Sequence, residues 1–335
     1  MKASFAKYSL NFKRPAGTSR GIYITRDVWF LFLENNGITG VGECAPLPGL
    51  SKETPEQVTQ QLKQICHDPL KFIEKPYTFK DTPSVHFALE SALLDLKNGG
   101  KQILFPSSFT SGKEGIIVNG LIWMSTFENQ KKQILEKIDA KFSCIKLKIG
   151  SLNFEEDLKM IEFIREQNPE VTIRVDANGA FLPEEAQAKL KCLARYNIHS
   201  IEQPVAAGNY DKMACLCAGS IIPVALDEEL IGINCIQQKE ELLNKIHPQF
   251  LVLKPSLHGG ISGCEEWIEL AEERSIGWWI TSYLESNIGL NAIAQWAYTK
   301  NIKIPQGLGT GQIFTNNVES SLELRGEKLW MRAAL

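Results

Sequence analysis

The chain has 335 residues, of which 44% are hydrophobic and 22% charged, and its formal net charge at pH 7 is −3. This composition is ordinary for a globular protein, and the small negative charge argues against nucleic acid or an anionic membrane as a partner. No apolar run approaches the roughly 18 residues of a membrane span, and no apolar segment with a cleavage site follows Met1. The eight dispersed cysteines are typical of free thiols in a reducing compartment. We therefore expect a cytoplasmic protein whose partner is a small molecule.

The N-terminal part of the chain alternates in hydrophobicity as β-strands do. Three strands are expected, over residues 3–12, 21–33 and 38–45. A Pro-Gly-Ser segment at 13–20 predicts a loop between the first two, and Asn35-Asn36-Gly37 predicts a hairpin turn before the third. The result is a three-stranded antiparallel meander. Apolar residues at helical spacing then predict helices over 54–66 and 84–96.

From residue 113 onward, short β-branched runs alternate with segments of helix length, which is the pattern of βα units. Eight strands are expected, over residues 116–122, 144–150, 171–176, 199–202, 221–227, 250–254, 277–283 and 302–309. Helices are expected over 126–139, 154–167, 183–195, 209–218, 239–246, 262–274 and 288–299. This order predicts an α/β fold with a parallel barrel. Residues 311–335 contain no further complete unit, and we expect them to pack back on the N-terminal domain.

Five of the expected strands end in a charged residue, at intervals of 25 to 28 residues along the chain. These residues are Lys148, Asp176, Glu202, Asp227 and Lys254. The carboxyl ends of the strands of a parallel barrel meet at one mouth, so the five side chains would point into one cavity. Three carboxylates suit a hard, oxygen-ligated cation such as Mg²⁺, and the absence of histidine or cysteine at matching positions argues against zinc. The alternative is that each acid caps the helix that follows it.

Two lysines, Lys146 and Lys148, lie two residues apart on one expected strand and therefore face the same side, the barrel interior. We expect burial and mutual repulsion to lower their pKa, with the metal acting in the same direction and the acids opposing it. A neutral Lys148 would be competent as a base. Lys254 enters from the far side of the mouth. A carbon acid between the lysines would lose a proton to one of them while the ion stabilises the enolate.

Weaker signals surround these residues. Asn178 and Glu228 each lie within two residues of a strand-end acid, and we expect Asn178 to support that acid and Glu228 to hold Lys146 or another supporting group. The last strand ends in Gly309-Thr310-Gly311, whose backbone amides suit an anion, with simple turn chemistry as an equal alternative.

Several short motifs together resemble the enolase superfamily, in its muconate-lactonising-enzyme-like branch, over nearly the whole chain. They are Lys146-Leu147-Lys148, Asp176-Ala177-Asn178, Glu202-Gln203-Pro204, Asp227-Glu228 and Lys254-Pro255. The resemblance implies a modified (β/α)7β TIM-like barrel over residues 113–310, beneath an α+β capping domain formed by 1–112 and completed by 311–335. It also implies Mg²⁺, with Mn²⁺ as a substitute, held by Asp176, Glu202 and Asp227.

Departures from other branches favour one family. Position 254 is lysine, whereas a mandelate-racemase-like member would carry a His-Asp dyad on the sixth and seventh strands. Dipeptide epimerases bind the substrate ammonium with Asp-x-Asp where this chain has Gly309-Thr310-Gly311, so an anionic substrate tail is favoured. Further strings are similar to the o-succinylbenzoate synthase family: Ser19-Arg20, Gly42 to Ser51, Ser282 to Ser286, and Gly307 to Gln312.

This resemblance implies a hydro-lyase reaction, the syn dehydration of 2-succinyl-6-hydroxy-2,4-cyclohexadiene-1-carboxylate to o-succinylbenzoate in menaquinone biosynthesis. Lys148 would remove the proton α to the ring carboxylate and then protonate the departing hydroxide. Lys254 would stay cationic against the ring face, and Lys146 would touch the bound carboxylate. Arg20 would close the site and exclude water. The other expected substrate contacts are Ser282, Glu285, Gly309 and Thr310.

Alternatives remain open at this point. The ion and the cationic side chains leave a positive excess over the three acids, which suits a dianionic substrate. The nearest alternative is an N-acylamino acid racemase, with Lys148 and Lys254 as opposed acid–base catalysts, or another cycloisomerase or epimerase of the superfamily. A non-catalytic metal-binding barrel is disfavoured because binding alone does not require neutral buried amines. The sequence predicts no oligomeric state.

Overall fold

The structure is a computed structural model. It describes residues 1–18, 21–74, 79, 81–150, 153–219 and 222–332. Arg20, which we expect to close the site, therefore lies outside the described residues. Within the described part, no helix is both long and apolar enough to cross a membrane.

An antiparallel sheet of order β1-β2-β3 forms the N-terminal part of the molecule. Its strands are β1 (Lys2–Thr18), β2 (Gly21–Asn35) and β3 (Ile38–Cys44). The predicted loop at 13–20 is wrong as far as it is described, because β1 continues to Thr18. Its pairing with β2 shifts register between Asn11 and Ala16, and this irregularity accommodates Pro15, which has no N–H to donate.

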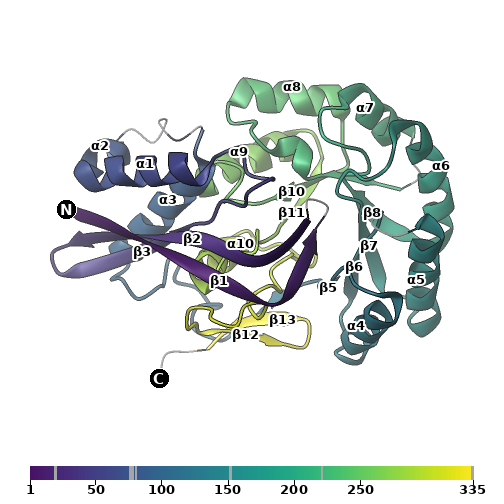
Figure 1. Ribbon diagram of the computed structural model, residues 1–335, viewed down its shortest axis with the longest axis horizontal. Coiled ribbons are helices and arrows are strands. Elements are labelled where there is room, and N and C mark those ends of the chain that lie inside the picture. Colours follow the sequence, from purple (N-terminus) through teal and green to yellow (C-terminus); the bar gives the residue numbers. More distant parts are fainter. Residues whose placement is uncertain (19–20, 75–78, 80, 151–152, 220–221, 333–335) are drawn as a thin grey trace.

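Three helices follow the meander and cover one side of it (Figure 1). They are α1 (Pro55–His67), α2 (Pro69–Glu74) and α3 (Pro83–Lys97). The first and third match the predicted helices, whereas α2 was not predicted. A Cβ at Gly42 would lie 1.9 Å from the carbonyl oxygen of Ala88, so glycine is what allows α3 to approach β3 so closely. Thr54 and Gln57 form a capping box at the start of α1.

Seven parallel strands curl into the second part of the molecule, in the order β11-β10-β9-β8-β7-β6-β5 (Figure 1). They are β5 (Gly120–Ile122), β6 (Cys144–Lys148), β7 (Thr172–Asp176), β8 (Ile198–Glu202), β9 (Val224–Leu226), β10 (Phe250–Leu253) and β11 (Gly277–Ile280). The helices are α4 (Phe127–Asp139), α5 (Phe154–Gln167), α6 (Pro183–Leu193), α7 (Tyr210–Gly219), α8 (Ile236–Ile246), α9 (Gly260–Glu273) and α10 (Asn287–Thr299). The predicted fold class is confirmed.

The eighth predicted strand, 302–309, is not a regular strand. It contributes two isolated parallel bridges, Val118 with Gln306 and Thr281 with Gly307, which connect the two edges of the curled sheet. Pro305 lacks an N–H and the glycines at 307 and 309 weaken strand structure, so a continuous ladder is not supported here. The predicted strand 116–122 is likewise divided, into β4 (Ile116–Ile117) and β5.

The C-terminal segment contacts both parts of the molecule. Residues 313–316 run beside β1, where the Lys13 amide donates to the Ile313 carbonyl and the Thr315 amide to the Asn11 carbonyl, both at 2.8 Å. Farther along, β12 (Leu322–Arg325) and β13 (Lys328–Met331) form a sheet with β4 instead of the N-terminal meander. The predicted domain limits, 1–112 with 311–335 and 113–310, stay a prediction.

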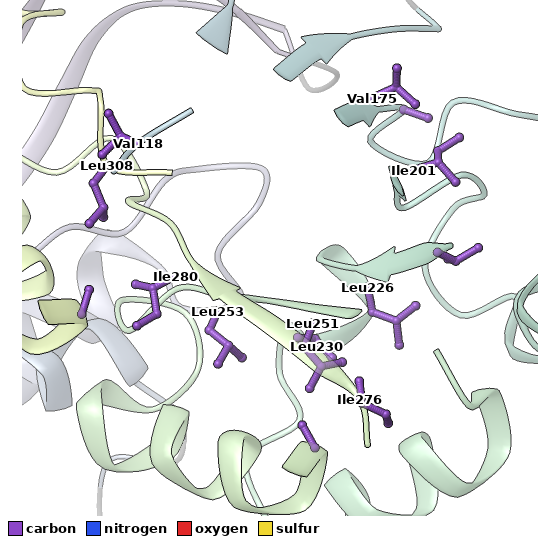
Figure 2. Close-up of a cluster of buried hydrophobic side chains, with 14 of the residues drawn as sticks. Val118, Val175, Ile201, Leu226, Leu230, Leu251, Leu253, Ile276, Ile280 and Leu308 are labelled. Carbon is purple, nitrogen blue, oxygen red and sulfur yellow. The ribbon is translucent and has the colours of Figure 1, made fainter. Parts of the chain in front are cut away.

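The largest hydrophobic cluster includes the strand residues whose side chains point away from the barrel interior. Figure 2 shows such residues, among them Val175, Ile201, Leu253 and Ile280, buried on the side of the sheet that the helices cover. The intervening residues face the barrel interior, where Ala225, Val252 and Trp279 form a small separate cluster. The polar residues at the strand ends follow the same inward-facing alternation.

Two carboxylates of the N-terminal part hold helices of the barrel in place. Glu43 on β3 accepts hydrogen bonds from the Ser286 amide (2.7 Å), the Ser286 hydroxyl (2.5 Å) and the Gly289 amide (2.7 Å), at the start of α10. Glu90 on α3 accepts from the amides of Ile261 and Ser262, at the start of α9. Both acids satisfy N–H groups that a helix leaves unpaired at its first turn.

Candidate active site

A cavity at the carboxyl ends of the barrel strands contains most of the residues that the sequence singled out. Its wall includes all three lysines and all three acids, together with these other predicted residues: Asn178, Glu228, Ser282, Gly309 and Thr310. The lysine side chains are largely buried, and that of Lys148 is 13% exposed. Residues far apart in the sequence therefore meet because successive parallel strands end at one mouth.

Lys146 lies between two acids. Its Nζ is 2.6 Å from Glu202 Oε2 and 3.0 Å from Asp176 Oδ2. Burial alone would lower the pKa of Lys146, but Asp176, Glu202 and Asp227 outweigh burial and raise that pKa above its usual range. The expectation of a lowered pKa at Lys146 is therefore wrong, because neighbouring carboxylates counted for more than desolvation. Lys146 is a cation in this site.

Lys148 is held by a chain of polar side chains. Its Nζ donates to Asn178 Oδ1 at 2.6 Å and lies 3.2 Å from Asp176 Oδ2. Asn178 Nδ2 in turn donates to Glu228 Oε1 at 3.0 Å, so Glu228 contacts Asn178 and not Lys146. The backbone of Asn178 is left-handed, with φ of 44°, a conformation that asparagine tolerates better than most residues. This turn directs the amide toward Lys148.

Lys254 follows β10, four strands away from the strand that carries the other two lysines. Its Nζ is 2.5 Å from each oxygen of Asp227. Burial would lower the pKa of Lys254, but Asp227, Glu202 and Glu228 outweigh it and raise the pKa. A cation thus faces the cavity from the side opposite Lys148.

The three acids are buried at the ends of three consecutive strands, β7, β8 and β9. The carboxylates of Asp176 and Asp227 cap no helix: the cap residue of α6 is Leu182, and Asp227, which precedes the short helix Glu228–Leu230, makes no side-chain cap hydrogen bond. Instead each carboxylate is paired with a lysine. The alternative interpretation of the acids as caps is therefore wrong for this site.

The three acids present oxygen donors of the kind that a divalent cation binds. In the described part of the chain, no three acidic, histidine or cysteine side chains are already gathered as a metal-binding set, because lysine amines lie against the carboxylates. However, the buried Glu202 Oε1 has no hydrogen-bond partner. Burial and neighbouring acids also raise the pKa of Glu202 and of Asp227. An all-oxygen donor set with excess buried negative charge fits a hard divalent cation.

The end of the cavity near the last barrel segment suits an anion. Ser282 Oγ and Thr310 Oγ1 lie 2.5 Å apart on its wall. The backbone amides of Gly309 and Thr310 have no hydrogen-bond partner among the described residues. Hydroxyls and free amides are the groups that bind a carboxylate without a fixed charge.

Glu285 does not line the cavity, which corrects its assignment as a substrate contact. The side chain is fully buried and accepts hydrogen bonds from the Ser256 hydroxyl at 2.6 Å and the Tyr283 amide at 2.5 Å. It therefore ties the loop after Lys254 to the loop that carries Ser282. The sequence placed Glu285 near the site but gave no indication of which way the side chain turns.

The sequence did not predict several apolar and aromatic side chains that line the cavity. The N-terminal part contributes Tyr23, Leu47 and Leu50, and the barrel contributes Trp123 and Tyr283. Leu47, Leu50 and Tyr283 lie in strings that carry the resemblance, but those strings do not show which side chains reach the cavity, because that depends on how the two parts of the chain pack together. The sequence also did not predict Asn119, which lies on the same inward-facing alternation as the lining residues Leu121 and Trp123.

The fold and this site define a barrel enzyme with opposed lysines and an acid cluster suited to a divalent cation. Residues 130–322 match the family described as enolase C-terminal domain-like, and residues 2–96 match the MenC N-terminal domain. The chain is 43% identical to the o-succinylbenzoate synthase of Desulfotalea psychrophila, over 97% of this chain and 98% of that one. It therefore belongs to the enolase superfamily and, within it, to the o-succinylbenzoate synthase family.

Other comparisons agree with this membership. The crystal structure of MenC from Desulfotalea psychrophila superposes with a TM-score of 0.88 at 40% identity and covers 99% of each chain. The N-succinyl-L-Arg/Lys racemase of Bacillus cereus is 27% identical over 88% of this chain and 82% of its own. The predicted resemblance to the enolase superfamily is confirmed, and enzymes of this superfamily use divalent cations.

Proposed function

We propose that this chain dehydrates 2-succinyl-6-hydroxy-2,4-cyclohexadiene-1-carboxylate to o-succinylbenzoate, a hydro-lyase step of menaquinone biosynthesis in the cytoplasm. The observation that carries the proposal is the placement of Lys148 and Lys254 on opposite sides of one buried cavity. A carbon acid bound there has an amine on each face. Membership in the o-succinylbenzoate synthase family supplies the identity of that carbon acid.

Lys148 is the proposed base. As a neutral amine it takes the proton from the ring carbon that bears the carboxylate, and the electron pair of that C–H bond passes into the carboxylate system. The resulting ammonium then gives the same proton to the leaving hydroxyl group as the C–O bond breaks, and water departs. Lys148 ends as it began. Asn178, itself bonded to Glu228, keeps the amine in place for both transfers.

Lys254 and Lys146 are the proposed cations. Neighbouring carboxylates raise the pKa of both, so both stay protonated at neutral pH. Lys254 would stabilise negative charge that spreads over the ring. Lys146 would donate to the ring carboxylate. These roles need no proton transfer, which fits amines that are difficult to deprotonate.

Asp176, Glu202 and Asp227 would hold a divalent cation, which we propose to be Mg²⁺, with Mn²⁺ as a substitute. When bound, this ion supplies electrophilic stabilisation of the carboxylate whose neighbouring carbon loses its proton. Asp176 also lies 3.2 Å from the Lys148 amine, so the same acid connects the base to the ion-binding group.

The substrate is proposed to be a dianion whose second carboxylate meets Ser282, Thr310 and the free amide of Gly309. The uncharged groups orient this carboxylate without competing for the three buried acids. Arg20, outside the described residues, is proposed to approach the same anion and exclude water. The apolar side chains Tyr23 and Leu50 would cover the ring.

A second candidate is racemisation of N-succinylamino acids, because Lys148 and Lys254 would then exchange the α-proton from opposite faces. A relative named N-succinyl-L-Arg/Lys racemase is consistent with that capacity in the superfamily. Incubation in deuterated water would detect it as loss of the α-proton signal.

The decisive test is a direct absorbance assay with the cyclohexadiene substrate. The wild-type chain should convert it, and Lys148→Ala should lower kcat about a thousandfold, the scale of lost acid–base catalysis. Binding of o-succinylbenzoate should persist in that variant. Dehydration at the wild-type rate by Lys148→Ala would refute the proposed mechanism.

A further inference from the structure

The side-chain amide of Asn119 is a polar group in the cavity wall that lacks a partner. Asn119 is 5% exposed and lines the cavity. Its side-chain amide makes no hydrogen bond to any other residue that the structure describes, and it is not among the unpartnered polar atoms that are sealed from solvent, so it reaches the cavity. Buried side-chain amides almost always have a hydrogen-bond partner. This amide is therefore available to a ligand.

The backbone fixes Asn119 beside the last barrel segment. Its backbone N–H donates to the Gln306 carbonyl at 2.9 Å, and the preceding residue, Val118, forms a parallel bridge with Gln306. Figure 2 shows Val118 and Leu308 in the buried cluster on the outer side of the barrel. Because strand residues alternate, Asn119 and Gly309 face the opposite side, which is the cavity.

The backbone of Asn119 lies close to Gly309 of this segment. A Cβ added to Gly309 would lie 3.7 Å from the Asn119 backbone carbonyl oxygen, an ordinary van der Waals contact that displaces no protein atom. Gly307 differs, because a Cβ there would lie 2.2 Å from Thr281 Oγ1 and is excluded by packing. Gly309 and Asn119 both line the cavity, so a ligand bound there can contact both.

The register separates Asn119 from the catalytic amines. Leu121 on β5, two residues after Asn119, pairs with Lys146 on β6. Asn119 is instead hydrogen-bonded to the segment that leads to Gly309 and Thr310. In the proposed function the lysines and acids serve the ring carboxylate, and Asn119 lies toward the end of the cavity that suits the second anion.

We propose that Asn119 is a specificity-determining residue that donates its side-chain N–H to a carbonyl-type oxygen of the succinyl arm. This inference rests on the proposed function, because the succinyl arm belongs to that substrate. Both the ketone and the terminal carboxylate offer such an oxygen. A neutral donor orients either one without adding charge to a site already crowded with ionic groups.

The test compares Asn119→Ala and Asn119→Asp with the wild type, using kcat/KM for dehydration and the affinity for o-succinylbenzoate from tryptophan fluorescence. Asn119→Ala should weaken binding about tenfold, as expected for one lost hydrogen bond to a charged or strongly polar group. Asn119→Asp should weaken it about a hundredfold through repulsion of the anion. Asn209→Ala, on the exposed surface, serves as the matched control and should change neither quantity.

Two analogues identify the oxygen. If the contact is to the ketone, Asn119→Ala loses its effect on 2-(3-carboxypropyl)benzoate, and if it is to the terminal carboxylate, the effect disappears with 2-butyrylbenzoate. Binding of o-succinylbenzoate within twofold of wild type by both Asn119→Ala and Asn119→Asp overturns the inference. A wild-type chain that fails to dehydrate the substrate overturns the proposed function instead, so the two failures are distinguishable.

Discussion

The contact of Glu43 with the start of α10 makes a prediction about stability and pH. Burial raises the pKa of this carboxyl from an ordinary value of 4.5 to about 7, although three hydrogen bonds from Ser286 and Gly289 act in the opposite direction. Between these two pH values the unfolded chain releases the proton while the folded chain keeps it. The free energy of unfolding therefore falls as pH rises through this window and levels off above pH 7. The fall attributable to Glu43 is about 3 kcal/mol.

Glu43→Gln removes this titration and keeps an acceptor oxygen for α10. We expect the difference in unfolding free energy, wild type minus variant, to decrease by about 3 kcal/mol from the acidic to the alkaline side of the window. Urea unfolding followed by circular dichroism at several pH values measures it. A Glu34→Gln variant, on the exposed end of β2, is the control for replacing an acid by its amide. Parallel pH profiles for wild type and Glu43→Gln would refute the reasoning.

Three further predictions concern the site. Lys254→Arg should abolish α-proton exchange of an N-succinylamino acid on the face that Lys254 contacts. It should spare part of the dehydration, because a cation is retained. Equal loss of both activities contradicts the assigned roles. Gly309→Ala should fold normally, since the nearest atom to its Cβ would be 3.7 Å away. It should lower kcat/KM about 10- to 100-fold, because the added methyl group occupies space that the ligand uses. Unchanged kinetics would place the substrate elsewhere. Exhaustive chelation should abolish dehydration, and Mg²⁺ or Mn²⁺ should restore it; full activity after chelation would exclude a required cation.

The barrel and its charged residues could be predicted because each strand carries local information. The β-branched runs determine where strands form, and the parallel connection then requires the ends at Lys148, Asp176 and Glu202 to lie side by side. No long-range packing has to be known for that inference. The strand predicted over 302–309 did not form, because Pro305 and the glycines there do not support a continuous ladder.

Features that depend on contacts between distant segments could not be predicted in this way. Tyr23 and Leu47 reach the cavity only because the N-terminal meander packs over the barrel. The buried orientation of Glu285 depends on Ser256 and on the Tyr283 amide, which no local pattern identifies. Side chains whose direction is set by tertiary packing carry no periodic signal in the sequence.

The prediction of a lowered pKa for Lys146 was wrong for an electrostatic reason, and the same reason explains how Lys146 and Lys148 differ. Desolvation and a neighbouring lysine were expected to favour a neutral amine, but Asp176 and Glu202 lie within 3.0 Å of Lys146, and their attraction exceeds both effects. An amine placed between two carboxylates is a poor base and a persistent cation. Lys148 differs in its surroundings: its closest partner, at 2.6 Å, is the neutral amide of Asn178, and a single carboxylate oxygen lies farther away at 3.2 Å. The two lysines thus share a strand face but not an electrostatic environment, and this difference in surroundings supports the proposal that Lys148 is the base.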